Sequence, residues 1–333
     1  MTKSDVLKQA KRRFSSSERT TLGRAIDYAT EKHQGQKRLS GDAYITHPLS
    51  VASILIDWNQ DLDSVIAGVL HDTVEDTDST LPEIEEQFGH DVAFLVDGVT
   101  KVSAIRQGMR PIGSYLPKTR DNLSKLLIAV GRDVRVLIIK LADRLHNLRT
   151  LEYLPPEKQQ KIAAESLEIF ARLADRLGMG RTRVEIEDIA FRYLDPTRYA
   201  QLQKLSKKRV YKAYSRLNEI KDQVGSALDA QKIKHSIDGR IKSIYSLHKK
   251  LAKYNQDFDE IHDLLAIRII VKNRSQCYRA MGIIHELYQP MLHKIKDYIA
   301  TPKTNGYRSI HTTVKTDDEQ IIEFQIRSQQ MHD

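Results

Sequence analysis

The sequence predicts a helical amino-terminal half followed by an α+β half that contains a mixed sheet. In the first half, apolar residues recur at the spacing of amphipathic helices, from about residue 22 to about residue 179. Beyond Asp195-Pro196 the residue pattern changes, and a long lysine-rich helix is expected, roughly from Tyr199 to Ala230. After it, β-branched runs typical of strands replace the helical spacing.

Successive helices are expected along the first half. Residues 22–33 and 47–58 are amphipathic, and residues 81–99 carry acids early and apolar residues at helical spacing. The pattern continues through residues 120–130, 132–151 and 156–179. Pro155-Pro156 stands at the start of the last of these segments, where proline is tolerated.

Strands dominate the second half. Residues 264–271 form a continuous β-branched run, as in a central strand. Residues 309–316 and 321–328 are separated by four polar residues and predict a β-hairpin, and a helix over 275–288 is expected between strands. The chain ends at Asp333, soon after the last expected strand, which favours a fragment of a longer protein. We therefore expect two domains, residues 1–195 and residues 196–333.

The composition is that of a globular protein, with 333 residues, 40% of them hydrophobic and 29% charged. No apolar run approaches the roughly 20 residues needed to span a bilayer, and the amino terminus lacks the apolar segment of a signal peptide. The single cysteine, Cys277, excludes an internal disulfide and fits a reducing compartment. A cytoplasmic location without membrane contact is expected.

The net charge of +9 favours an anionic partner, such as nucleic acid, a membrane surface or nucleotide phosphates. A solvated surface rich in lysine and arginine explains the same charge equally well. Neither of the two common glycine-rich phosphate-binding patterns occurs, so bound phosphates would be held mainly by side chains.

One short segment, "LHDTVEDT" at 70–77, carries four ionisable side chains: His71, Asp72, Glu75 and Asp76. On a helix, residues four apart lie near one face, so the four would gather on one turn. Three acids on such a face repel one another unless a cation neutralises them. Histidine and carboxylate are ligands for a borderline divalent metal.

Two other segments can complete a metal site. His47 precedes a proline at the start of an expected helix, and Asp143 and Asn147 lie four apart on another. Each residue alone has a structural interpretation: His47 as a helix-start histidine, Asp143 as the ion-pair partner of Arg144, and His146 as a packing residue. The combination is harder to explain by structural need, and it gives a four-ligand set: His47, His71, Asp72 and Asp143.

These motifs carry a resemblance to a known family. "GQKRLSGDAYITHP" (35–48), "LHDTVEDT" and "KLADRLHNLRTL" (140–151) resemble, in order and spacing, the hydrolase domain of the RelA/SpoT homologues, the (p)ppGpp synthetase–hydrolases. That domain belongs to the HD phosphohydrolase superfamily. The resemblance implies an all-α HD-type fold, one Mn²⁺ in the four-ligand set, and release of pyrophosphate from the 3′ position of the guanosine.

The resemblance also implies roles for residues around the metal. Glu75 and Asp76 would orient and deprotonate the attacking water, which agrees with the general chemistry of metal-assisted hydrolysis. Leu39 departs from the family pattern, which usually has a second basic residue there, so weaker substrate binding is expected. The implied nucleotide contacts are Arg38, Ser40, Asn147 and Thr150.

The second half concentrates basic and aromatic residues near its strands. "GRIKSIYSLHKKL" (239–251) places several cations along a short helix-forming stretch, which a solvated basic face also explains. Arg268, inside an apolar strand, needs a partner or a ligand. Residues 296–313 are expected to collect polar groups in one loop, where Tyr307 follows an Asn-Gly turn and either stacks on a base or packs over its own loop. Glu323 alternates with apolar residues on the last strand.

From about Gly239 onward the chain resembles the synthetase domain of the same family, with a nucleotidyltransferase-like fold. The implied reaction moves the β,γ-pyrophosphate of ATP to the 3′-OH of GDP or GTP. Asp263 and Glu323 would hold Mg²⁺, and Glu323 would draw the proton from the hydroxyl. Tyr307 would stack on guanine with Asn305 and His311 nearby. The implied contacts to ATP and its phosphates are Arg240, Lys242, Lys250, Arg268, Lys296 and Lys303.

The leading hypothesis is therefore a bifunctional enzyme whose substrates are ATP, GDP or GTP, and (p)ppGpp. A second hypothesis keeps only the hydrolase, with a degraded synthetase. A third is a nucleic-acid-binding regulatory protein, which would need a basic stripe with interleaved aromatics, and aromatics are sparse at 7%. Ribosome contact is expected only through a carboxy-terminal region that this chain lacks.

Overall fold

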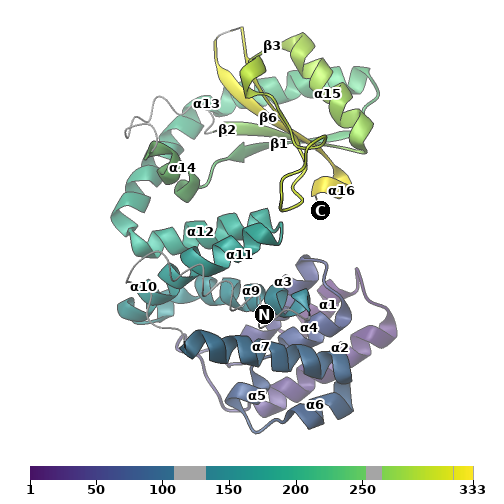
Figure 1. Cartoon of the computed structure of the whole chain (residues 1–333), viewed down its shortest axis with the longest axis vertical. Coiled ribbons are helices and arrows are strands. Elements are labelled where there is room, and N and C mark those ends of the chain that lie inside the picture. Colours follow the sequence, from purple (N-terminus) through teal and green to yellow (C-terminus); the bar gives the residue numbers. More distant parts are fainter. Residues whose placement is uncertain (109–132, 253–264, 318, 333) are drawn as a thin grey trace. The chain divides into compact units, whose positions relative to one another are not determined.

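A computed structural model describes residues 1–108, 133–252, 265–317 and 319–332. The chain divides into two compact units, Met1–Leu173 and Ala174–Asp333 (Figure 1). The division between the two units comes earlier in the chain than the domain boundary predicted after residue 195. That domain boundary stays a prediction. Among the described helices, none combines the length and the apolar character that a membrane crossing requires. The helix predicted over 120–130 lies outside the described residues.

The described part of the first unit is helical apart from one isolated β-bridge between Lys37 and Ala43. The last of its helices, α11, continues into the second unit. The elements are α1 (Lys3–Ala10), α2 (Ser16–Lys32), α3 (Thr46–Asp57), α4 (Leu62–Leu70), α5 (Thr73–Asp76), α6 (Leu81–Phe88), α7 (His90–Gly108), α9 (Val134–Arg149), the 3₁₀ turn η1 (Leu151–Tyr153), α10 (Pro156–Glu165), the π turn η2 (Ser166–Phe170) and α11 (Ala171–Arg176).

The core of the first unit forms where α4 packs on α3 and α9 (Figure 1). Helix α4 is buried from Ser64 to Leu70, as its uninterrupted apolar sequence predicts. Its close approach to α3 depends on Gly68, because a side-chain carbon at this position would overlap Leu55. The tight contact carries the end of α4 toward the start of α3, where His47 lies.

Three helical expectations in this unit need correction. Residues 81–99 belong to two helices rather than one, because Gly89 adopts a φ of 94° between α6 and α7. The segment 156–179 is interrupted by the π turn η2 and ends its helix at Arg176. Helix α4 ends at Leu70, and the short α5 begins at Thr73, so His71 and Asp72 lie between two helices rather than inside one.

The second unit is α+β. The strands of its described residues have the order β1-β2-β6-β5-β3, with β4 paired to β5. The β2–β6 pair is parallel and the other pairs are antiparallel, so the predicted mixed sheet and the β5–β6 hairpin are confirmed. Its elements are α12 (Gly180–Leu194), α13 (Pro196–Ala230), β1 (His235–Ile241), α14 (Ile244–Leu251), β2 (Leu265–Val271), α15 (Arg274–Leu287), β3 (Gln289–Pro290), η3 (Leu292–Lys294), β4 (Lys296–Asp297), β5 (Ile310–Lys315), β6 (Ile321–Ser328) and α16 (Gln329–His332).

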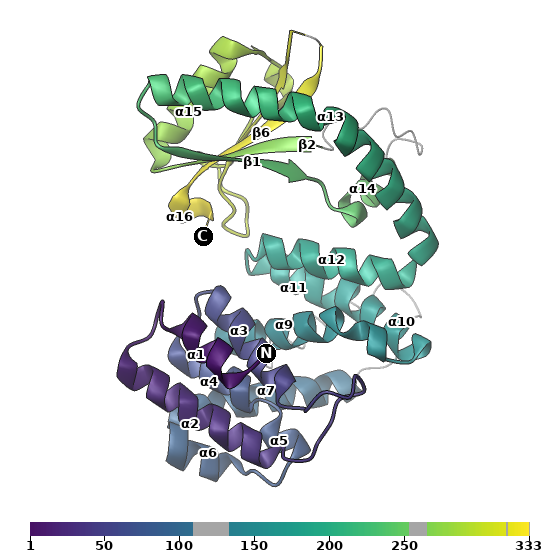
Figure 2. The same cartoon turned by 180° about the vertical axis from the view of Figure 1, so that it is seen from behind.

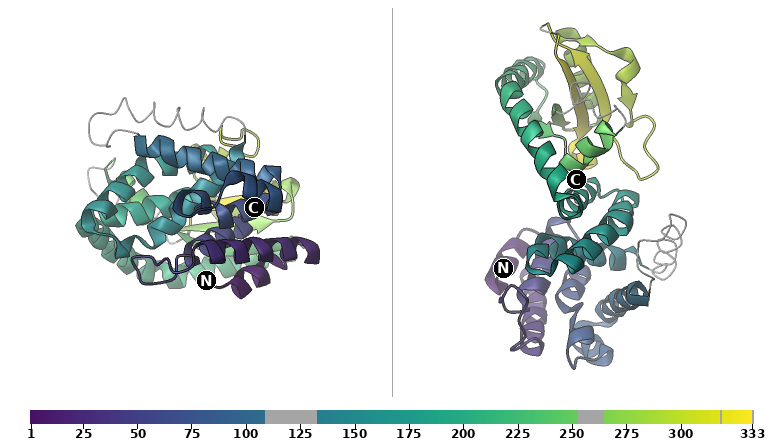
Figure 3. Two further views of the ribbon diagram at one scale, coloured as in Figure 1. Left: turned by 90° about the horizontal axis from the view of Figure 1, so that it is seen from below. Right: turned by 90° about the vertical axis from the view of Figure 1, so that its left-hand side faces the viewer.

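Two helices cover one face of this sheet. Figure 2 shows α13 crossing β1 and β2, and the right-hand view of Figure 3 shows it running along one side of the strands. Ile220 and Val224 of α13 and Ile284 of α15 share one buried cluster with Ile267 and Phe324 of the sheet. Because side chains alternate along a strand, the intervening polar residues face away from these helices.

Two assignments in the second unit were wrong. Strand β1 was not predicted, and it contains Arg240, which was expected on a helix-forming stretch; α14 begins only at Ile244. Residues 296–313 do not form one loop, because Lys296 lies in the short strand β4 and His311 in β5. Pairing within the sheet stabilises β1 and β4, whose own sequences carry little β-strand signal.

Candidate functional site

Two buried histidines converge at the junction of α3 and α4. His71 follows the last residue of α4, and its Nδ1–H donates to the carbonyl oxygen of Gly68 at 2.9 Å. A neutral imidazole bonded in this way carries its lone pair on Nε2. That nitrogen is buried and has no hydrogen-bond partner among the described residues. A buried polar atom without a partner is costly, so its position calls for a ligand.

Two carboxylates surround these rings. Asp72 Oδ1 lies 3.1 Å from His71 Nε2, and Asp143 Oδ1 lies 3.3 Å from His47 Nε2. Asp72 Oδ2 is 3.5 Å from the same His47 nitrogen. Ring lone pairs and carboxylate oxygens repel one another unless a cation lies between them. One ligand atom from each of His47, His71 and Asp143 falls within 4.8 Å of the others, and this donor set fits a divalent metal.

A lysine shapes the charge of the cluster from behind. Lys140 Nζ lies 2.7 Å from Asp143 Oδ2, and both side chains are buried. Burial alone would raise the pKa of Asp143, but the Lys140 ammonium holds that pKa well below its usual range. The alternative that Asp143 pairs with Arg144 is wrong, since Arg144 forms its ion pair with Glu165 at 3.0 Å.

A tyrosine links two of the acids, and it was not singled out as a site residue. The Tyr44 hydroxyl lies 2.8 Å from Asp72 Oδ2 and 2.9 Å from Asp76 Oδ2. Burial, together with these two carboxylates, raises the pKa of Tyr44, so it keeps its proton. A phenol has one proton, so it donates to one acid at a time. The signal was available, because Tyr44 lies three residues before His47 inside a motif already considered.

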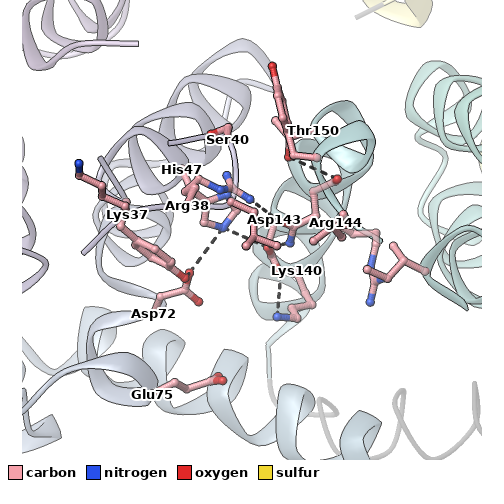
Figure 4. Close-up of a pocket in the computed structure, with 16 residues that line it drawn as sticks. Lys37, Arg38, Ser40, His47, Asp72, Glu75, Lys140, Asp143, Arg144 and Thr150 are labelled. Carbon is pink, nitrogen blue, oxygen red and sulfur yellow. Dashed lines mark hydrogen bonds and ion pairs between the residues drawn. The ribbon is translucent and has the colours of Figure 1, made fainter. Parts of the chain in front are cut away.

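A cavity of about 430 Å³ opens beside the His/Asp cluster (Figure 4). Figure 4 shows the carboxylate of Glu75 apart from the His47 and Asp72 side chains, because the break after α4 removes it from the common helix face that was expected. The predicted residues that line the cavity are Arg38, Ser40, His47, Asp72, Glu75, Asp143, Asn147 and Thr150. Residues that sequence reasoning missed also line it: Lys37, Tyr44, Lys140 and Tyr153.

Arg38 is held at the cavity by the last turns of α9. Its Nη2 donates to Asn147 Oδ1 at 3.1 Å, and its Nη1 lies 3.2 Å from Nδ1 of His146. Asn147 in turn donates to Asp143 Oδ1 at 2.5 Å. Leu39, the neighbour of Arg38, lines the same cavity with 70% of its surface exposed. The guanidinium is therefore tied to the cluster, while the adjacent apolar side chain is open to solvent.

In the second unit, the strand register gathers polar residues on the sheet face opposite α13 and α15. Lys296 pairs with His311, His311 with Gln325, and Gln325 with Arg268, so the four form one row across four strands. Glu323, two residues from Gln325, shares this face. Its Oε1 accepts a hydrogen bond from Gln325 Nε2 at 2.7 Å and lies 3.3 Å from His311 Nδ1.

Tyr307 is half-buried beside this row. Its hydroxyl accepts a hydrogen bond from Arg327 Nη2 at 2.8 Å and lies 2.8 Å from His311 Nε2. Lys303 Nζ lies 5.2 Å from the ring centroid. Asn305 donates from Nδ2 to the carbonyl oxygen of Asp175 at 3.0 Å. The loop thus places the tyrosine ring between cations, and its packing is compatible with both interpretations given for Tyr307.

The remaining predicted residues are dispersed along the unit. Arg240 lies in β1 opposite Ala266, and Lys242 follows that strand. Lys250 lies in α14, whose first turn is anchored by Asp188 of α12 through the Tyr245 amide at 2.8 Å. Asp263 lies outside the described residues, so its predicted pairing with Glu323 does too.

The first unit is helical and carries a His/Asp cluster beside a cavity that Arg38 lines. The second unit is built on a mixed sheet with basic residues on its open face. These features define an HD-domain protein with a second α+β module. Residues 25–180 match the HD domain, and residues 239–333 match the region found in RelA/SpoT proteins. These two matches confirm the predicted resemblance to the RelA/SpoT family. The predicted fold class is confirmed by this pair of domains.

Sequence similarity to named relatives extends over nearly the whole chain. The guanosine-3′,5′-bis(diphosphate) 3′-pyrophosphohydrolase of Spiroplasma citri is 44% identical over 93% of this chain and 41% of its own length. The GTP pyrophosphokinase of Myxococcus xanthus is 43% identical over 93% of this chain and 41% of its own. The bifunctional (p)ppGpp synthase/hydrolase RelA of Mycobacterium tuberculosis is 42% identical over 96% of this chain and 42% of its own. The chain thus spans about two fifths of these relatives.

Proposed function

We propose that this chain both hydrolyses and synthesises (p)ppGpp, using one site in each unit. The observation that carries the hydrolase proposal is the buried Nε2 of His71, which faces Asp72 at 3.1 Å and has no hydrogen-bond partner among the described residues. It lies beside a cavity that Arg38 lines. The names of the relatives support both activities. A cytoplasmic location and contact with a ribosome through a further region, as in the expectation above, belong to the same proposal.

In the hydrolase site, His47, His71, Asp72 and Asp143 would hold Mn²⁺. When bound, the ion would lower the pKa of a water molecule and offset phosphate charge. Asp76 would receive the proton of the attacking water, because its carboxylate is exposed and oriented by the Tyr44 hydroxyl at 2.9 Å. Glu75 lines the cavity and would orient the same water. The residues proposed to contact the nucleotide are Arg38, Ser40, Asn147 and Thr150.

In the synthetase site, Glu323 and Asp263 would hold Mg²⁺, and Glu323 would take the proton of the attacking 3′-hydroxyl of GDP or GTP. When bound, the ion would neutralise charge on the transferring phosphates of ATP. Phosphoryl transfer depends mostly on positioning and charge, and Lys296 and Arg268 of the polar row beside Glu323 would supply that charge. Tyr307, Asn305 and His311 would receive the guanine nucleotide. The residues proposed for ATP are Arg240, Lys242, Lys250, Arg268, Lys296 and Lys303.

The direct test is a pair of incubations followed by chromatography of the products. The protein with ppGpp and Mn²⁺ should release pyrophosphate and GDP, and the protein with GDP, ATP and Mg²⁺ should form ppGpp and AMP. Hydrolysis without synthesis would leave a hydrolase with a degraded synthetase. Neither reaction, together with RNA binding that weakens steeply with salt, would replace the proposal by a nucleic-acid-binding protein.

Restoring a cation at position 39 should strengthen substrate binding. Leu39→Lys places an ammonium at the edge of the cavity, and an exposed ion pair contributes up to about 1 kcal/mol, equivalent to about fivefold in affinity. We expect KM for ppGpp to fall by up to about fivefold at low salt and to return toward the wild-type value at high salt. Leu39→Met is the neutral control. Equal KM values for the lysine and methionine variants at low salt would contradict this role.

Removing the Tyr307 ring should weaken acceptor binding. Stacking of a base on an aromatic ring contributes about 1–3 kcal/mol, so Tyr307→Ala should raise KM for GDP about tenfold or more and leave KM for ATP unchanged. Tyr307→Phe keeps the ring and loses the hydrogen bonds with Arg327 and His311. A phenylalanine variant close to wild type supports stacking. Equal defects in both variants would mean that the hydroxyl, which holds the loop in place, is what matters.

A further inference from the structure

His146 contacts His47 of the His/Asp cluster, although His146 is not one of the four predicted ligands. It lies in α9 three residues after Asp143, and its ring is 4.9 Å from the ring of His47 between centroids. The Nδ1 atoms of the two histidines are 2.7 Å apart. Two ring nitrogens at this distance share one proton, so one of them donates and the other accepts.

Arg38 decides which histidine accepts. Its Nη1 lies 3.2 Å from the same Nδ1 of His146, and a guanidinium can only donate. Nδ1 of His146 therefore carries a lone pair, and the shared proton belongs to Nδ1 of His47.

The position of this proton fixes the other face of His47. A neutral imidazole with its proton on Nδ1 has its lone pair on Nε2. Nε2 of His47 is the atom that faces Asp143 Oδ1 at 3.3 Å and Asp72 Oδ2 at 3.5 Å. Without an acceptor at His146 the opposite tautomer would be favoured, because Nε2–H could then donate to either carboxylate. In that tautomer His47 cannot bind a metal through Nε2.

We propose that His146 is a positioning residue whose Nδ1 lone pair holds the proton of His47 on Nδ1 and so keeps the Nε2 lone pair directed into the His/Asp cluster. The inference rests on the proposed metal-dependent function of that cluster. In this arrangement the His146 imidazole is the hydrogen-bond acceptor behind a metal-binding histidine, a role that a carboxylate or a carbonyl usually has. At His71 that role belongs to the Gly68 carbonyl.

Two variants separate this role from simple packing. His146→Asn keeps an acceptor, because its Oδ1 occupies roughly the place of Nδ1 and can receive hydrogen bonds from both His47 and Arg38. His146→Leu has similar volume and no acceptor. We expect the Mn²⁺ dissociation constant, measured by electron paramagnetic resonance of the free ion, to rise about 10–100-fold in His146→Leu and to stay close to wild type in His146→Asn.

A second readout needs neither metal nor activity. Nitrogen-15 NMR of the histidine rings in metal-free protein should show His47 with its proton on Nδ1 in the wild type and in His146→Asn, and on Nε2 in His146→Leu. The wild-type spectrum alone tests the assignment even if the leucine variant fails to fold. A wild-type His47 protonated on Nε2, or equal loss of Mn²⁺ affinity in both folded variants, would overturn the role of His146.

The same measurements distinguish this inference from the proposed function. If the wild type binds no Mn²⁺ and releases no pyrophosphate from ppGpp, but the tautomer of His47 changes as expected in His146→Leu, the hydrolase proposal fails and the hydrogen-bond assignment stands. If the wild type binds Mn²⁺ and the tautomer does not respond to His146→Leu, the role of His146 fails and the hydrolase proposal stands.

Discussion

Replacing Asp72 with alanine should abolish ppGpp hydrolysis and leave ppGpp synthesis measurable. Asp72 approaches both histidines of the cluster, at 3.1 Å from His71 Nε2 and 3.5 Å from His47 Nε2. Without its charge, the two rings and Asp143 are a weaker site for a divalent ion. Changes behind metal ligands already cost about 10–100-fold, so loss of a ligand should reduce hydrolysis by more than about 100-fold. Product chromatography on the same preparation measures both activities.

Asp78→Ala is the matched control for this experiment. Asp78 is a carboxylate in the same stretch of chain, exposed and paired with Lys32 at 2.9 Å, and exposed ion pairs contribute little to stability. It should keep both activities. Asp72→Asn, which preserves the side-chain shape, separates loss of charge from loss of packing. Equal loss of hydrolysis and synthesis in a variant that still unfolds at the wild-type temperature would argue against two separate sites.

Replacing Glu323 with glutamine should have the opposite effect, a loss of synthesis of more than about 100-fold with hydrolysis retained. The proposed roles of Glu323 in holding Mg²⁺ and in taking the proton both need its negative charge, and electrostatic groups of this kind contribute about 10²–10³-fold each. Glutamine keeps the size of the side chain and can still accept the hydrogen bond from Gln325. Synthesis of ppGpp from GDP and ATP, followed over a range of Mg²⁺ concentrations, measures the loss.

Glu319→Gln provides the corresponding control. Glu319 lies at the turn of the same β5–β6 hairpin, where its exposed carboxylate pairs with Lys315 at 2.7 Å. This change removes a charge from the turn of the hairpin and leaves the contacts of Glu323 with Gln325 and His311 in place, so synthesis should persist. A wild-type rate of synthesis in Glu323→Gln would mean that Glu323 has a structural role beside His311. A loss of synthesis in both variants would mean that the fold of the hairpin, and not the Glu323 carboxylate, is what synthesis requires.

The local sequence predicted more of the helices and strands correctly in the first unit than in the second. Helical spacing predicts most of its elements, because an amphipathic helix records its buried face in its own residues. It does not reveal the break after Leu70, since neither glycine nor proline stands between Leu70 and the acids that follow. In the second unit the strand β1 was missed, because it is held by pairing with β2, seven residues in register, rather than by a strong pattern of its own.

The sequence by itself determined which residues meet at the His/Asp cluster, since His47, His71, Asp72 and Asp143 belong to recognisable motifs. His47 lies at the start of an apolar helix, His71 and Asp72 follow one, and Asp143 lies inside one. Only the tertiary structure decided how they are oriented. The close approach of α3 and α4 at Gly68, the reach of Tyr44 to two acids and the contact of His146 with His47 all join residues far apart in the chain. The physical reason is that helical periodicity specifies a buried face, whereas hydrogen-bond partners and tautomers depend on what the packing of other helices brings against that face.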